Sequence, residues 1–104
     1  MPPRRLLVIL ATGPEAGDLA RAAALLGAAH RRGAPATLFA MHHGVRALAA
    51  EPALVRDLLD HGDVIGCATS ADLHGVDLAA LGVQIGSQHD HAPRAEHDVL
   101  VAFA

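Results

Sequence analysis

The sequence contains few of the residues on which several classes of protein depend. Its 104 residues include one cysteine (Cys67), two phenylalanines, no tryptophan and no tyrosine. A single cysteine excludes an intrachain disulfide, a four-cysteine zinc site and a CxxC redox pair. The scarcity of aromatic side chains argues against recognition of single-stranded nucleic acid by base stacking.

A surplus of charge of one sign is also missing. Eight arginines, no lysines and eleven acidic residues give a formal net charge of −3. Because the arginines are scattered and form no basic footprint, we expect no nucleic-acid partner. No segment approaches the roughly 20 apolar residues that span a bilayer, so we expect no membrane partner. The apolar run at 6–11 is too short for a signal peptide and leads into TGPE, which predicts a cytoplasmic protein.

The hydrophobic content and the order of apolar segments indicate the fold class. With 52% hydrophobic residues, the chain is predicted to form one domain over residues 1–104. Short apolar runs predict strands at 6–11, 36–41, 63–67, 83–85 and 99–103. Helical spacing predicts helices at 18–32, 45–50, 54–61, 68–73 and 77–81, and residues 86–97 predict a loop with a kinked or partial helix. This alternation predicts a single-domain α/β three-layer sandwich with a mostly parallel five-stranded sheet.

The ends of the predicted strands carry the candidate functional residues, since ligands of α/β sheets bind at the carboxyl ends of strands. Cys67 ends the third strand directly before a helix. The partial positive charge of a helix N-terminus favours the thiolate, which is the reactive form of cysteine. This position predicts a catalytic Cys67. The alternative is a buried structural cysteine that packs with Val64 and Ile65.

Other polar residues follow the same strand ends and are candidates for binding or supporting roles. One of His42, His43 and His74 could act on the Cys67 sulfur as a base or as a cationic neighbour, and the sequence leaves open which one does so. The alternative for each histidine is a solvated or capping side chain. Either of the hydroxyl residues after Cys67 could cap the helix that begins there. The candidates are Thr12, Gly13, His42, His43, Thr69, Ser70 and His74. Thr12 also has the spacing of a capping box with Glu15, and Asp18 is an equal candidate for the N-cap residue of this helix.

Three further histidines raise the question of a metal site. His89, His91 and His97 lie in one polar stretch, but an HxH pair alternates faces in a strand and suits one ion poorly on a helix. We therefore expect no metal and no cofactor. A histidine-rich metal-binding protein stays open as an alternative function.

The order of these features resembles the DsrE/DsrF-like family of small sulfur-relay proteins, over nearly the whole chain. The similar segments are the first strand with TGPE and its Ala/Leu-rich helix, ATLFAM with HHGV, DHGDVIGCATSADLHGV, and IGS with DVLVAF. The stretch 88–97, rich in histidine, departs from the family, as does the low aromatic content.

The resemblance implies a parallel α/β fold and a homo-oligomer, a trimer or a hexamer. It also implies that Cys67 accepts sulfane sulfur as a persulfide, as in the family's sulfur-carrying members. A sulfur-donor protein and a sulfur-acceptor protein with a thiol would then be the partners, and the chain would be a sulfurtransferase or sulfur-carrier subunit. The alternative is a non-catalytic oligomeric binding or assembly module in which Cys67 is structural.

Overall fold

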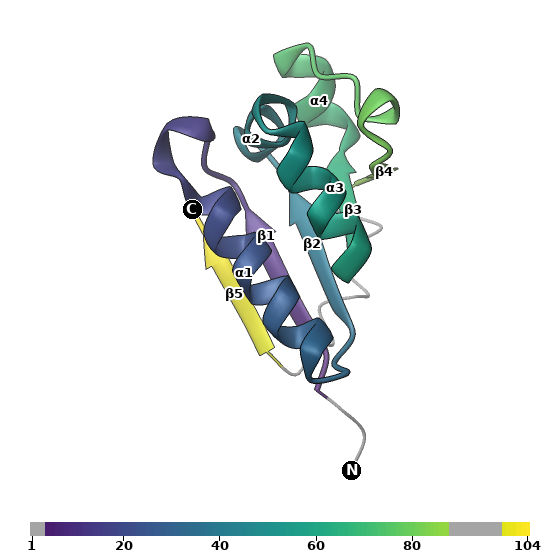
Figure 1. Ribbon diagram of the computed structural model, residues 1–104. Helices are drawn as coiled ribbons and strands as arrows, with labels where there is room; N and C mark the ends of the chain where they lie inside the picture. The colour runs from purple at the N-terminus through teal and green to yellow at the C-terminus, as the bar shows by residue number, and fades with distance from the viewer. Residues whose placement is uncertain (1–3, 88–98) are drawn as a thin grey trace.

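A five-stranded, fully parallel sheet forms the centre of the molecule (Figure 1). The computed structural model describes residues 4–87 and 99–104. The strand order is β4-β3-β2-β1-β5. The strands are β1 (Leu6–Leu10), β2 (Ala36–Ala40), β3 (Asp63–Cys67), β4 (Gln84–Gly86) and β5 (Val99–Phe103). The predicted α/β class and the predicted five-stranded sheet are confirmed.

The helices of the described residues begin and end close to the predicted positions. They are α1 (Asp18–Arg31), α2 (Gly44–Ala50), α3 (Pro52–His61) and α4 (Ala68–His74), with 3-10 turns η1 (Pro14–Ala16) and η2 (Ala79–Leu81). The helix predicted at 77–81 is instead the shorter turn η2. There the Asp77 carboxylate accepts a hydrogen bond from the Ala80 N–H at 3.1 Å, which holds the chain in a turn before it enters β4.

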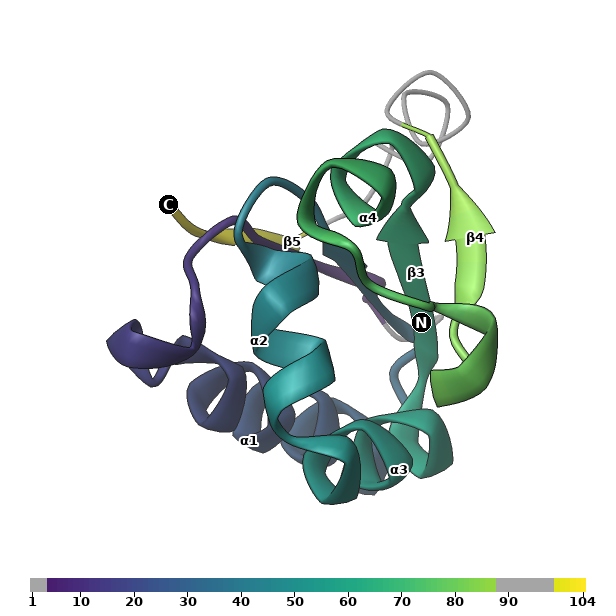
Figure 2. The ribbon, with the colours of Figure 1, turned by 90° about the horizontal axis from the view of Figure 1, so that it is seen from above.

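The two faces of the sheet carry different clusters, because successive side chains of a strand point to opposite faces. We call the face that carries Leu10, Leu38 and Val64 the helix face. Its side chains join residues of α1, α2 and α3 in one large core cluster, and Figure 2 shows these three helices on the same side of the sheet. The opposite face, here called the cysteine face, carries a smaller cluster of Leu7, Phe39, Ile65 and Cys67, with Ile9 and Met41 packed against it.

Two further sequence expectations concern the segment before β5 and the absence of a membrane-spanning helix. The loop and the kinked or partial helix predicted at 86–97 fall mainly outside the described residues. Within the described ranges, no helix has the length and apolar character needed to cross a membrane.

Candidate functional site at the carboxyl edge of the sheet

The carboxyl ends of β1, β2 and β3 lie side by side, and a glycine brings the chain close at this edge. The Met41 N–H donates to the Leu10 carbonyl at 2.9 Å, and the Gly44 N–H donates to the Met41 carbonyl at 2.8 Å. A Cβ atom on Gly44 would overlap the Leu10 carbonyl oxygen. Only glycine therefore allows α2 to begin directly against the end of β1, and this places His42 and His43 at the edge.

Cys67 is the last residue of β3 and the N-cap residue of α4, with extended backbone angles (φ −70°, ψ 122°). The residue is 5% exposed and belongs to the apolar cluster of the cysteine face. Its position before a helix is as predicted. Among the described residues, no hydrogen bond or ion pair is found at its sulfur.

The helix start at Cys67 corrects one sequence expectation. Neither Thr69 nor Ser70 caps α4, because the helix begins earlier, at Ala68, and both residues lie within its first turn. Thr69 is exposed to solvent, whereas Ser70 is buried. The Ser70 hydroxyl accepts a hydrogen bond from the backbone N–H of His42 at 2.8 Å, so it connects α4 to the end of β2.

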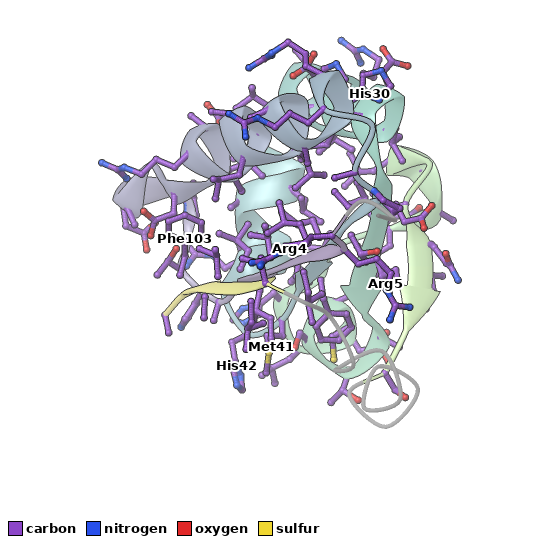
Figure 3. The ribbon with its side chains drawn as sticks, turned by 90° about the horizontal axis from the view of Figure 1, so that it is seen from below. Arg4, Arg5, His30, Met41, His42 and Phe103 are labelled. Atoms are coloured by element: carbon purple, nitrogen blue, oxygen red, sulfur yellow. The ribbon has the colours of Figure 1, made fainter. Side chains whose placement is uncertain are left out.

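His42 is the residue of this edge with unusual backbone geometry. Its φ is +50°, and among the described residues it is the non-glycine residue with a positive φ. Such a conformation is uncommon outside glycine and is enriched at functional sites. Figure 3 shows Met41 and His42 on the side of the sheet away from α1, which is the cysteine face. His42 therefore lies on the same face of the sheet as Cys67.

His43 and His74 meet each other instead. Their ring centroids are 4.8 Å apart, with the rings tilted by 43°. His43 Nδ1 lies 3.1 Å from an Arg46 guanidinium nitrogen, and the same nitrogen lies 3.8 Å from a Glu15 carboxylate oxygen. These polar contacts connect η1, α2 and α4. They were not predicted, because the sequence does not reveal that α2 and α4 are neighbours.

Thr12 and Gly13 lie at the end of β1, which β2 separates from β3. The Thr12 hydroxyl donates to the Asp18 carboxylate at 2.8 Å, and the Gly13 carbonyl accepts from the Ala16 N–H at 3.2 Å. These bonds fix the turn that leads into α1. The predicted capping box is wrong, since no side chain caps η1 or α1 and Glu15 turns toward Arg46.

The three candidate metal ligands, His89, His91 and His97, lie outside the described residues. Within the described residues, no group of three or more His, Cys, Asp or Glu side chains could hold a metal ion. The absence of a cofactor remains a prediction.

A pair of grooves on the described surface lies at opposite ends of the strands. The smaller, about 190 Å³, lies between α4, η2 and β4 and is lined in part by Ala68, the residue after Cys67. The larger, about 370 Å³, lies at the amino ends of β2 and β3 beside His30 and His61, whose ring centroids are 5.0 Å apart. Because the larger groove is at the far end of the strands from Cys67, the smaller one is the more relevant to cysteine chemistry.

Comparisons with known proteins support the fold. No protein-family model matches the chain, and no curated protein matches its sequence. The structure is similar to the conserved protein of unknown function BT1422 from Bacteroides thetaiotaomicron, with a TM-score of 0.78 and 12% identity over 96% of this chain and 95% of that one. It is also similar to the ychN protein of E. coli, with a TM-score of 0.71 and 19% identity over 96% of this chain and 99% of that one. Both structures are less than 25% identical to this chain, so the comparisons show a shared fold and nothing finer.

Proposed function

We propose that the chain is a sulfur-relay protein that carries sulfane sulfur as a persulfide on Cys67 and passes it to a thiol of a partner protein. The observation that carries the proposal is the position of Cys67. It ends a central strand at the carboxyl edge of a parallel sheet and is the N-cap residue of α4. Sites of α/β sheets gather at this edge. The resemblance of the sequence to the DsrE/DsrF-like family also supports the proposal.

The transfer needs one cysteine in this chain and no redox partner. The Cys67 thiolate attacks the outer sulfur of a donor persulfide, R–S–S–H. The new sulfur–sulfur bond forms as the old one breaks, and the donor leaves as the thiolate R–S⁻. Cys67 then carries –S–S–H, and an acceptor thiolate removes the outer sulfur in the same way. Atoms and charge balance in each step, so the presence of a single cysteine in the chain is sufficient.

The burial of Cys67 means that donor access requires a local movement. The residue is 5% exposed. Among residues 4–87 and 99–104, its cluster on the cysteine face is much smaller than the core of the helix face. Local opening costs less free energy where few apolar contacts must break. We therefore propose that the cysteine face opens locally while the helix face stays packed.

His42 and Ser70 are the residues we assign to positioning this site. Ser70 holds the His42 backbone in its left-handed conformation through the 2.8 Å hydrogen bond. His42 in turn follows the strand next to β3 and lies on the cysteine face. It is the candidate for the base or cationic neighbour of the Cys67 sulfur. Roles for Thr12, Gly13, His43, Thr69 and His74 stay predictions.

Sulfur loading of the folded chain tests the proposal. The purified protein is incubated with a small-molecule persulfide donor, and its intact mass is measured with and without a later reducing step. Because Cys67 is the chain's one cysteine, Cys67→Ala is a complete control. The proposal predicts a gain of one sulfur atom that reduction removes and that Cys67→Ala lacks. It would be falsified if the folded chain gained no sulfur while the urea-unfolded chain did.

The burial of Cys67 favours a second candidate function, a non-catalytic binding or assembly module with a structural cysteine. Free cysteine behaves as a small hydrophobic residue in such clusters. This alternative predicts that Cys67→Ala changes stability alone and leaves every interaction of the protein intact. The loading experiment separates the two functions.

The proposed relay also concerns the compartment, the oligomeric state and the partners of the protein. A cysteine without a disulfide partner agrees with a reducing compartment, so we propose that the protein acts in the cytoplasm. We further propose a homo-oligomer, a trimer or hexamer, that acts between a sulfur-donor and a sulfur-acceptor protein.

A further inference from the structure

The groove between α4, η2 and β4, here called the α4–β4 groove, has an apolar floor. Its apolar lining includes Ala68, Ala71, Leu78 and Ile85. Leu78 is buried, whereas Ile85, on the edge strand β4, is 57% exposed. The groove measures about 190 Å³, which is below the roughly 300 Å³ at which small-molecule sites begin. It therefore has the size for one side chain of a partner protein rather than for a cofactor.

Two carboxylates line the same groove. Asp72, in α4, and Asp77, before η2, are both exposed to solvent. One Asp77 oxygen accepts a hydrogen bond from the Ala80 N–H at 3.1 Å, which leaves the negative charge in place. Within residues 4–87 and 99–104, neither carboxylate forms an ion pair. The groove thus combines an apolar floor with two negative charges that nothing in the described chain neutralises.

The chain around the groove has no arginine or lysine of its own. Residues 63–87 contain three aspartates and neither of the two basic residue types. His74, the histidine of α4, contacts the His43 ring at the start of α2 and does not line the groove. Protein interfaces are arranged so that a negative surface meets a positive one. Charge complementarity therefore selects a basic occupant for this groove.

We propose that the α4–β4 groove binds an arginine or lysine side chain of a partner protein. Both side chains have an apolar stem and a charged tip. The stem packs against Ala68, Ala71 and Ile85, and the charged tip pairs with Asp72 and Asp77. An apolar side chain leaves the two carboxylates without a partner, and an acidic side chain is repelled by them. A long basic side chain matches both parts of the groove.

The position of the groove relative to Cys67 connects it with the relay. Its lining begins at Ala68, directly after Cys67 at the carboxyl edge. Ile85 is paired with Gly66, and the next residue, Cys67, points to the opposite face, so a segment that reaches both must cross this edge of β3. On the basis of the proposed function, the partner is the sulfur-acceptor protein, with its basic residue a few positions from its reacting cysteine.

Peptide binding to the folded, sulfur-free chain tests the groove separately from the relay. The probe is a short peptide with one arginine and with serine in place of the reacting cysteine. Two matched peptides have glutamine or glutamate instead of the arginine. Titration of the isotope-labelled protein, followed by NMR, gives the dissociation constants. We expect the arginine peptide to bind most tightly and the glutamate peptide most weakly, with shifted amide signals at Ala68, Ala71 and Ile85.

Three variants locate the binding. Asp72→Asn and Asp77→Asn each remove one charge of the groove, and asparagine at position 77 keeps the oxygen that accepts from the Ala80 N–H. Each substitution should weaken binding of the arginine peptide by about threefold, as expected for exposed ion pairs. Asp60→Asn is the matched control, because Asp60 is an exposed aspartate of α3 outside the groove. It should leave the dissociation constant unchanged.

The results that overturn the proposal differ from those that overturn the relay. The proposal fails if the arginine peptide does not bind, or binds no more tightly than the glutamine peptide. It also fails if a folded variant with both Asp72→Asn and Asp77→Asn binds the arginine peptide as tightly as the wild-type protein. If the relay alone is wrong, the chain still selects the arginine peptide in this titration but gains no sulfur on Cys67.

Discussion

The helix face and the cysteine face of the sheet come from the same strands, yet they differ in how they are packed. Leu38 and Phe39 are adjacent in β2 and both are buried, but Leu38 joins the large cluster with α1, α2 and α3. Phe39 joins the small cluster that holds Cys67. Large, dense cores contribute most of the global stability, whereas small clusters open at lower cost. Within the described part of the chain, the helix face thus holds most of the core, and in the proposed relay the cysteine face carries the sulfur chemistry.

The same substitution on the two faces tests this division most strongly. Leu38 and Leu7 are 0% and 2% exposed. Leu38→Ala leaves a cavity between sheet and helices that relaxes poorly, and we expect it to lower the free energy of unfolding by about 4 kcal/mol. Leu7→Ala leaves a cavity in the smaller cluster, which relaxes more, and should cost about 2.5 kcal/mol. Urea unfolding at equilibrium measures both values, and equal or reversed losses would remove the distinction between the faces.

Two substitutions of Cys67 itself test whether its environment on the cysteine face is apolar and dry. Cys67→Ala removes one buried atom from an apolar cluster and should cost about 1 kcal/mol. Cys67→Ser places a hydroxyl there without a partner and should cost about 2 kcal/mol. Thermal unfolding of the two variants distinguishes these values. If Cys67→Ser were as stable as Cys67→Ala, water would already reach this position in the folded chain.

The smallest expected effect on stability comes from substitution of His42, whose backbone is left-handed. A left-handed backbone is unfavourable for histidine and acceptable for glycine, so His42→Gly should raise the free energy of unfolding by about 0.5 kcal/mol. Ser70→Ala removes the acceptor of the His42 N–H and should lower it by about 1 kcal/mol. If His42 serves the Cys67 sulfur, His42→Gly also loads sulfur more slowly despite its stability. A variant that loads at the wild-type rate would limit His42 to a role in the turn.

Much of the fold could be predicted from the sequence because hydrophobic periodicity is a local signal. β3 and β5 have the predicted bounds, and α1 ends within one residue of its predicted end. The sequence predicts a helix at 77–81 where the structure has the turn η2, because a side-chain bond to a backbone N–H gives no periodic pattern.

The site was predictable in part, for the same reason. The place of Cys67 follows from strand and helix order. Its burial depends on which face of β3 it occupies and on the residues of β1 and β2 beside it. The bond between Ser70 and His42 joins residues 28 positions apart, and the contact of His43 with His74 depends on the packing of α2 against α4. Gly44 itself was the one local sequence signal that the start of α2 closely approaches the end of β1.

The rate at which an alkylating reagent modifies Cys67 in the wild-type protein and in Leu38→Ala, without denaturant, tests the central claim most directly. If the cysteine face opens locally, the loss of stability on the helix face leaves this rate unchanged within about twofold. If Cys67 reacts only after global unfolding, a loss of about 4 kcal/mol accelerates alkylation by several hundredfold, at tenfold for each 1.4 kcal/mol. An unchanged rate supports a reactive Cys67 in the folded protein, and a rate that follows global stability contradicts the sulfur-relay account.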